Sequence, residues 1–417
     1  MKRIVFCGLV KSLFSCNVRV KRTEQGSRIK EKIFGEATGK RVTEKSEETM
    51  EFLNITIDGL NVSDPSGMTI LEAADNAGIE IPRLCHQEGI KPSGNCRICV
   101  VEVEGSRTLV GSCHTPIVEG MVVSTHSPKV MEARRIAIEL LLAGHTGTCV
   151  TDAEARTCSL HKLASDLEVG PPRFHVKRPR LYGVEDVSPY VRRDMSKCIL
   201  CRKCVRACTE ITGRDVYSMA YRGFGSKVVV DCDIPLNKEV CKDCGICIDY
   251  CPTNALIWPE GVKKREGGKK EKTKENLVAR NINRNKLLEL LKARQKMAGF
   301  LSEQSLKEIA EHLSIPVSEV YGVASFYAFL STKPQGKNVI RVCKSMPCHL
   351  ENAPTIIAAI ERVIGIKPGQ TTPDGQFSFE LTNCIGVCDQ APAMLVGDVL
   401  YGNLTPEKIT DVLNSYR

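Results

Sequence analysis

The sequence lacks the patterns that would assign it to several common classes of protein. It has no run of about 18 apolar residues, so we expect no transmembrane helix. It has neither a G-x-G-x-x-G fingerprint nor a G-x-x-x-x-G-K-[ST] loop, so we expect no NAD or flavin site in this chain. Aromatic residues make up only 5% of the 417 residues, which favours several small modules over one large core.

Cysteine, in contrast, is abundant, with 21 in the chain. The cysteines cluster in C-x2-C units, a pattern typical of metal ligands, whereas disulfide-dense scaffolds are short and secreted. We therefore expect metal centres in a reducing compartment, and hence a cytoplasmic protein. The formal charge of +9 leaves a zinc-binding or nucleic-acid-binding protein as an alternative, although residues 263–274 alone carry seven basic and two acidic side chains.

The apolar pattern predicts an α+β protein of several domains. Alternation of apolar and polar residues predicts strands, and apolar residues every three or four positions predict helices. Ser302 and Ser318 would open the second and third helices of a helical stretch that precedes an α/β module of thioredoxin-like size. The predicted elements are a strand pair at 51–63 turned at Asp58-Gly59, helices at 69–77 and 129–143, a strand at 99–105, three helices within 286–330, strands at 340–343, near 377–382 and near 394–401, and helices at 354–364 and 406–416.

The first cysteine group follows the predicted helix at 69–77. Four thiolates from one long loop and a later strand can surround a [2Fe–2S] cluster, at a spacing similar to that of plant-type ferredoxins. Gly94 would let backbone N–H groups turn toward the cluster. A zinc site is the alternative, although zinc sites usually pair two short C-x2-C units and only one is present. The predicted ligands are Cys85, Cys96, Cys99 and Cys113.

The most specific pattern is a pair of C-x2-C-x2-C-x3-C runs, the second ending in Cys-Pro. It resembles the signature of bacterial two-[4Fe–4S] ferredoxins, in which the fourth cysteine of each run serves the other cluster. A zinc ribbon would need two C-x2-C pairs instead of two runs of four. The resemblance implies one cluster on Cys198, Cys201, Cys204 and Cys251, and another on Cys241, Cys244, Cys247 and Cys208.

The last group lies in the thioredoxin-like module and consists of Cys343-x4-Cys348 and Cys384-x3-Cys388. A redox dithiol is the rival interpretation, but that chemistry favours C-x-x-C, and neither pair has this spacing. The flanking phrases VYGVASFYAFL, IRVCKSMPCHL and NCIGVCDQAPAMLVGDVLYGNLTPEKI resemble the small thioredoxin-like [2Fe–2S] subunit of NADH:quinone oxidoreductase and of soluble NAD-linked hydrogenases. This resemblance spans about residues 287–417 and implies a second [2Fe–2S] cluster.

Residues 51–258 resemble the N-terminal part of the complex I large iron–sulfur subunit and of [FeFe] hydrogenases, through GNCRICVVEVEG, KCILCRKCVRACTEI and CKDCGICIDYCPTNAL. That family has a further [4Fe–4S] cluster with one histidine and three cysteine ligands, which implies His145, Cys149 and Cys158 here. The family's middle cysteine is replaced by Asp152, which is a harder ligand for a soft cluster. His161 could serve instead, or the cluster could be absent and His145 a surface residue.

Together the resemblances imply an electron-transfer subunit with two [2Fe–2S], two [4Fe–4S] and a third [4Fe–4S] cluster. Its partners would be a flavoprotein that binds FMN and NAD(P)H and a terminal catalytic subunit or ferredoxin, within a soluble hydrogenase, formate dehydrogenase or electron-bifurcating transhydrogenase. A component of a membrane-associated NADH:quinone oxidoreductase is the alternative. We expect no catalytic residue, no bound nucleic acid and no direct membrane insertion.

The cysteine groups also set the expected domain boundaries. Cys7, Cys16 and Cys232 stay outside the groups, and Cys232 is expected to be a packing residue. The predicted domains are a poorly structured extension at 1–49, a [2Fe–2S] ferredoxin-like domain at 50–128, a His/Cys segment at 129–180, a two-[4Fe–4S] ferredoxin at 181–258, a basic linker at 259–285, and a thioredoxin-like [2Fe–2S] domain with a helical N-terminal part at 286–417.

Overall fold

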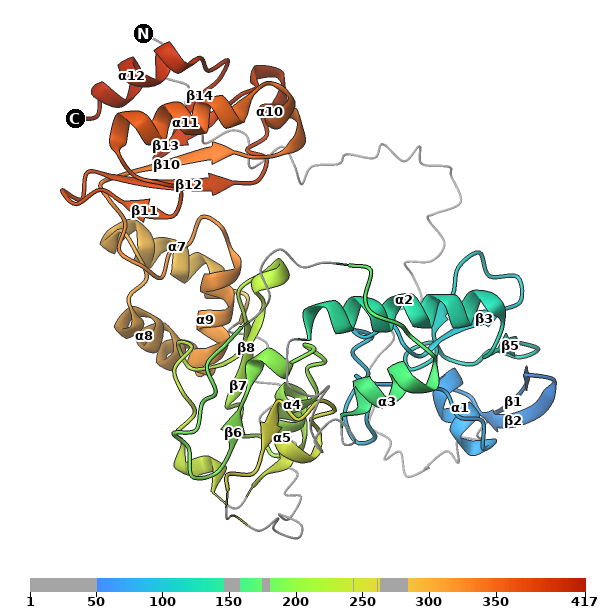
Figure 1. Cartoon of the computed structure of the whole chain (residues 1–417). Helices are drawn as coiled ribbons and strands as arrows, with labels where there is room; N and C mark the ends of the chain where they lie inside the picture. The colour runs from blue at the N-terminus through green and yellow to red at the C-terminus, as the bar shows by residue number, and fades with distance from the viewer. Residues whose placement is uncertain (1–50, 146–157, 175–180, 243, 261, 263–283) are drawn as a thin grey trace, which may run out of the picture. The chain divides into compact units, whose positions relative to one another are not determined.

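The computed structural model describes residues 51–145, 158–174, 181–242, 244–260, 262 and 284–417 (Figure 1). The predicted extension, most of the predicted linker, and Cys7, Cys16, Cys149 and Asp152 lie outside these residues. Among the helices it describes, none is both long and apolar enough to span a bilayer.

The first described part is a five-stranded mixed sheet with one short helix. Its hairpin turns at Asp58 and Gly59, as predicted, and both residues have positive φ. The helix begins after Thr69, whose side chain and Glu72 form a capping box. The sheet order is β2-β1-β5-β3-β4, with β1 and β5 parallel. The elements are β1 (Phe52–Ile57), β2 (Leu60–Pro65), α1 (Ile70–Asn76), β3 (Val100–Val103), β4 (Val110–Gly111) and β5 (Val122–Ser124).

The next part contains the two cysteine runs in short helices, together with two small strand pairs. The predicted helix at 129–143 is present and ends at Gly144, as expected. One strand pair joins the start and end of this part, and a second pair lies between the two runs. The elements are α2 (Pro128–Gly144), α3 (Ser159–Asp166), β6 (Arg192–Arg193), α4 (Lys203–Arg206), the π-helix η5 (Ala207–Ile211), β7 (Tyr217–Ala220), β8 (Lys227–Val230), α5 (Ile246–Asp249) and β9 (Leu256–Ile257).

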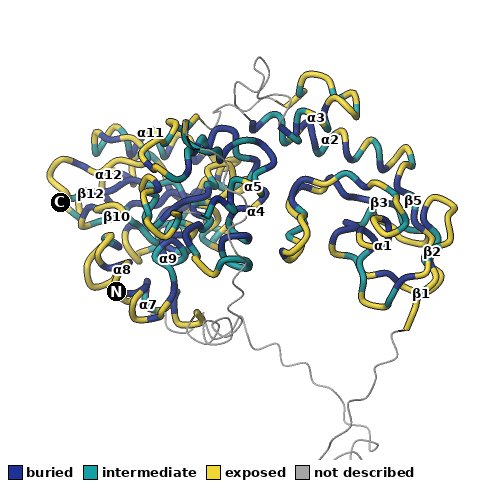
Figure 2. Tube along the Cα trace, turned by 90° about the horizontal axis from the view of Figure 1, so that it is seen from below, coloured by how far each residue is buried: buried dark blue, intermediate teal, exposed yellow. Residues whose placement is uncertain are grey.

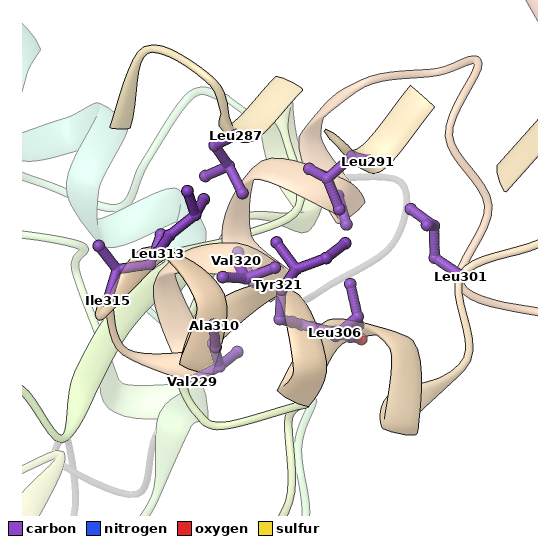
Figure 3. Close-up of a cluster of buried hydrophobic side chains, with 13 residues drawn as sticks. Val229, Leu287, Leu291, Leu301, Leu306, Ala310, Leu313, Ile315, Val320 and Tyr321 are labelled. Atoms are coloured by element: carbon purple, nitrogen blue, oxygen red, sulfur yellow. The ribbon is translucent and has the colours of Figure 1, made fainter. Parts of the chain in front are cut away.

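Three helices, α7 (Leu287–Ala298), α8 (Glu303–Leu313) and α9 (Val317–Phe326), share one hydrophobic core with the β7–β8 hairpin. Figure 3 shows the side chain of Val229, from β8, in the same cluster as residues of these helices. Ser302 caps α8, as predicted. The prediction for Ser318 is wrong, because α9 begins at Val317 after Pro316 and Ser318 is buried inside the helix.

The C-terminal part is a five-stranded sheet of order β11-β12-β10-β13-β14. Its core joins β10, β12 and β13 to two helices, as the thioredoxin-like pattern predicted. Both the strands and the helices of this part carry buried residues, and the helices keep an exposed side (Figure 2). The elements are β10 (Asn338–Cys343), α10 (Met346–Leu350), α11 (Ala353–Ile364), β11 (Gln370–Thr371), β12 (Phe377–Thr382), β13 (Met394–Val396), β14 (Val399–Tyr401) and α12 (Pro406–Asn414).

Close packing of α9 on β7 depends on Gly322. A Cβ at this position would lie 2.4 Å from the carbonyl oxygen of Met219. Gly322→Ala is therefore expected to lower the free energy of unfolding by about 1–3 kcal/mol, measured by anaerobic urea unfolding. Gly225→Ala is the matched control, because nothing lies within 4 Å of a Cβ added there. Equal stability of the two variants would contradict the close approach.

Candidate metal centres

The four cysteines of the first group are all buried and their thiols lie in two pairs. The amide of Cys96 donates to Cys85 Sγ at 3.5 Å, and the Cys96 thiol also hydrogen-bonds to Cys85, which lowers the pKa of Cys85. The same relation joins Cys99 and Cys113, where the thiol hydrogen bond lowers the pKa of Cys99. In a [2Fe–2S] cluster each iron holds two protein ligands, so this pairing fits that cluster.

Arg134 anchors the loop of the first group to α2. Arg134 as a residue is 1% exposed, and its guanidinium donates to the carbonyl oxygens of Ile98 at 3.1 Å and Val100 at 2.9 Å. Burial lowers the pKa of Arg134, and the nearby Cys99 thiolate acts to raise it. No motif in the sequence predicts this role, although Arg134 falls on the apolar stripe between Val130 and Ile138 of the helix, where a charge is unexpected.

The His/Cys segment brings together His145, Cys158 and His161. One donor atom from each lies within 4.8 Å of the others. His145 is 8% exposed, so the interpretation of His145 as a surface residue is wrong. Burial lowers the pKa of His145 to about 4, which favours the neutral imidazole that binds metals.

The two cysteine runs meet as the ferredoxin resemblance implied. Cys198, Cys201, Cys204 and Cys251 line one cavity, although Cys251 belongs to the second run. Burial raises the pKa of Cys201 to about 12, and the Cys198 and Cys251 thiolates raise it further. Buried thiols of this kind stay protonated until a metal displaces the proton, so the pocket suits a cluster better than four free thiolates.

Cys208, the last cysteine of the first run, faces the cysteines of the second run. It lies in the π-helix η5, an uncommon turn that often marks functional sites. Burial raises the pKa of Cys241 to about 11, with further contributions from Cys208 and Cys244. Gly245 in this run has a positive φ of 66°, and a Cβ there would lie 2.2 Å from the ring of Trp258. Only glycine therefore fits the turn between Cys244 and Cys247.

Lys203 is a buried cation between two of the cysteine groups. Its side chain lies on α4, and Nζ donates to Gln87 Oε1 at 3.1 Å in the loop of the first group. Burial lowers the pKa of Lys203, whereas thiolates of both groups, among them Cys201 and Cys85, act to raise it. A single ammonium group is thus placed to act on both centres, which the sequence analysis did not foresee.

Lys203→Met is expected to lower the reduction potentials of both neighbouring centres without loss of iron. A unit charge roughly 8–16 Å away contributes about 1–2 kcal/mol at an effective dielectric constant of 20. For one electron this corresponds to about 40–90 mV. Redox titration followed by EPR measures the shift, and Lys292→Met, at an exposed position of α7, is the control. Unchanged potentials would show that Lys203 has no electrostatic role.

The fourth group is the cysteine set of the thioredoxin-like module: Cys343 ends β10, Cys348 lies in α10, and Cys384 and Cys388 follow β12. Cys343 and Cys348 are buried, whereas Cys384 and Cys388 are exposed with their Sγ atoms 3.5 Å apart. Burial acts to raise the pKa of Cys343, but hydrogen bonds from the Ser345 amide and from Cys348 outweigh it and lower this pKa. The thiols again form two pairs, the arrangement that fits a [2Fe–2S] cluster.

The comparisons with known proteins match successive parts of the chain. Residues 51–128 match a 2Fe-2S iron-sulfur cluster binding domain, and residues 188–257 match the ferredoxin-like domain of NADH-quinone oxidoreductase subunit 3. Residues 273–417 match the thioredoxin-like [2Fe-2S] ferredoxin family. The matched families indicate both 2Fe-2S and 4Fe-4S clusters, and none of the three matched ranges includes His145, Cys158 or His161.

Two curated relatives are similar to half of the chain. The NADP-reducing hydrogenase subunit HndD of Solidesulfovibrio fructosivorans is 41% identical over 219 residues, which cover 50% of this chain and 36% of that protein. The NADH-ubiquinone oxidoreductase 75 kDa subunit of Reclinomonas americana is 37% identical over 206 residues, which cover 49% of this chain and 29% of that protein. The chain therefore spans about a third of the length of these relatives.

A solved chain of an NAD+-reducing [NiFe]-hydrogenase superposes with a TM-score of 0.45 and 28% identity, over 52% of this chain and 92% of that chain. The chain accordingly joins modules similar to the N-terminal part of the complex I large subunit and of hydrogenases to a module similar to thioredoxin-like [2Fe–2S] ferredoxins.

Proposed function

We propose that the chain is an iron–sulfur electron-transfer subunit of an NAD(P)H-dependent oxidoreductase complex. The complex would be of the hydrogenase, formate dehydrogenase or electron-bifurcating transhydrogenase type. The observation that carries this proposal is the gathering of sixteen cysteine thiols into four compact groups within one chain. The hydrogenase relative, at 41% identity, supports the same class of complex.

The proposed role follows from the chemistry of the cofactors. A flavin accepts a hydride as two electrons, whereas an iron–sulfur cluster carries one electron at a time. A chain of clusters can therefore connect a partner flavoprotein, which binds FMN and NAD(P)H, to ferredoxin or to a terminal catalytic subunit. This chain contributes burial, hydrogen bonds and charges such as Lys203, which set the potential of each cluster.

We propose five metal centres in the loaded protein. Two are [2Fe–2S] clusters in the first and fourth groups, and two are [4Fe–4S] clusters in the ferredoxin-type runs. The fifth is a [4Fe–4S] cluster with His145, Cys149 and Cys158 as ligands and with either Asp152 or His161 as the fourth. The unpartnered, buried Nε2 of His145 supports a metal at this position.

We place the protein in the cytoplasm, because its cysteines cluster in C-x2-C units typical of metal ligands, whereas disulfide-dense scaffolds are short and secreted. A component of a membrane-associated NADH:quinone oxidoreductase is the second candidate, which the 75 kDa relative favours. The two candidates differ in their partners, since only the second requires membrane subunits.

Anaerobic purification of the native complex tests the proposal. About sixteen irons per chain are expected, with an equal amount of acid-labile sulfide, from two [2Fe–2S] and three [4Fe–4S] clusters. A flavoprotein should co-purify and should reduce the clusters when NADH or NADPH is added. A colourless protein that contains zinc and no sulfide would end the proposal.

A further inference from the structure

The start of β7 contacts two cysteines that belong to different runs. The amide of Val216 donates to Cys208 Sγ at 3.4 Å, and the amide of Tyr217 also hydrogen-bonds to this thiol. The hydroxyl of Tyr217 lies 3.5 Å from Cys247 Sγ, which is a hydrogen-bond distance for an acceptor as large as sulfur. One short segment therefore directs hydrogen-bond donors at two of the four thiols that the proposed cluster of the second run would use.

The ring of Tyr217 is held in place by the core around it. Tyr217 is 4% exposed and shares a hydrophobic core with Cys208 and Cys247. The buried guanidinium of Arg193 lies 5.7 Å from the centroid of the ring and donates to the carbonyl oxygen of Val228 at 3.0 Å. A buried tyrosine hydroxyl needs a hydrogen-bond partner, because it has lost its contact with water. The partner in this core is the sulfur of Cys247.

The direction of this hydrogen bond follows from the protonation of its two atoms. A cysteine that binds iron is a thiolate, so its sulfur can only accept. Burial raises the pKa of Tyr217 well above its usual range, so the hydroxyl keeps its proton and donates it. Burial also raises the pKa of Cys247, and the hydrogen bond from Tyr217 acts to lower it, as expected of a donor that stabilises a thiolate.

We propose that Tyr217 raises the reduction potential of the [4Fe–4S] cluster of the second run by donating a hydrogen bond to Cys247 Sγ. The inference rests on the proposed function, which predicts this cluster on Cys208, Cys241, Cys244 and Cys247. A hydrogen bond to sulfur stabilises negative charge there, and the reduced cluster carries one electron more than the oxidised cluster. Donation from Tyr217 therefore favours the reduced state, while the proton stays on the tyrosine oxygen.

Tyr217→Phe tests the inference, because it keeps the ring and removes only the hydroxyl. In the full chain, purified anaerobically with its partners, the variant should keep its iron and sulfide, and the cluster should become harder to reduce. The ratio of reduced to oxidised cluster at a fixed potential should fall about three- to tenfold, which corresponds to a potential lower by about 30–60 mV. Redox titration followed by EPR measures the shift, and the signal of this cluster is the one that Cys208→Ser removes.

Tyr250→Phe is the matched control within the same run. The hydroxyl of Tyr250 donates to the carbonyl oxygen of Glu88 at 3.3 Å, so its removal should leave the potential unchanged. Replacement of Tyr217 by 3-fluorotyrosine, a more acidic donor of nearly the same size, should raise the potential above that of the wild type. A purely structural role of Tyr217 would not produce this upward shift.

The readouts separate failure of the inference from failure of the proposed function. An unchanged potential in Tyr217→Phe, or equal shifts in Tyr217→Phe and Tyr250→Phe, would overturn the inference and leave the proposed function intact. If Tyr217→Phe lost the cluster, the fluorinated protein would decide, and a potential equal to that of the wild type would overturn the inference. Wild-type protein without iron and sulfide would instead refute the proposed function itself.

Discussion

Cys208→Ser is expected to damage the cluster of the second cysteine run and to leave the cluster of its own run intact. The chain should lose about four irons, because Cys208 faces Cys241 and Cys244 across the domain. Burial raises the pKa of Cys208, so a serine there, with a far less acidic hydroxyl, is a poor substitute ligand. Iron and sulfide analysis with low-temperature EPR measures the loss, and electron flow through the complex should fall at least about tenfold, since one cluster of the series is missing.

Cys232→Ser is the matched control for this variant. Cys232 is a partly buried cysteine that packs against the core of α7–α9, as the sequence analysis expected of a packing residue. The Cys232→Ser variant should keep all of its iron. If Cys208→Ser instead destroyed the cluster of Cys198, Cys201 and Cys204, the crossed assignment of ligands would be wrong.

Cys343→Ser is expected to remove one [2Fe–2S] cluster and to stop reduction of the chain by the proposed flavoprotein partner. Cys343 is buried at the end of β10, where the Ser345 amide and the Cys348 thiol stabilise its thiolate. The chain should lose about two irons and one [2Fe–2S] EPR signal. Reduction by NAD(P)H through the partner should fall to background, while dithionite still reduces the remaining clusters.

Because the C-terminal sheet has a core of its own, the Cys343→Ser variant tests whether the parts of the chain hold their clusters independently. The sheet of β10, β12 and β13 has its own hydrophobic core, so damage at Cys343 should stay local. Loss of all clusters together would contradict independent modules. Unchanged reduction by NAD(P)H would show that the flavoprotein delivers electrons at another cluster.

The spacing of apolar residues, together with turn and capping residues, made much of the fold predictable from the sequence. The turn at Asp58-Gly59, the cap at Ser302 and the end of α2 at Gly144 each depend on local chemistry that a single sequence displays. Ser318 was misplaced because Pro316 fixes the backbone at the start of α9, and proline takes precedence over a serine cap two residues later.

Long-range partners were not predictable. Lys203 reaches Gln87, and Arg134 reaches Ile98 and Val100, across distances in the sequence that no local pattern encodes. The same applies to the packing of α9 on β7, which depends on the absence of a side chain at Gly322. Tertiary packing decides such contacts, and only structure reveals them.

The core shared by the β7–β8 hairpin and the α7–α9 helices has a consequence for how the chain can be divided. A fragment that starts at Leu287 would present Leu291, Leu306 and Val320 to water once Ala220 and Val229 are removed. Such a fragment would tend to self-associate when produced alone. Because one polypeptide carries both sides of this contact, the ferredoxin-type and thioredoxin-like parts are always made in equal number.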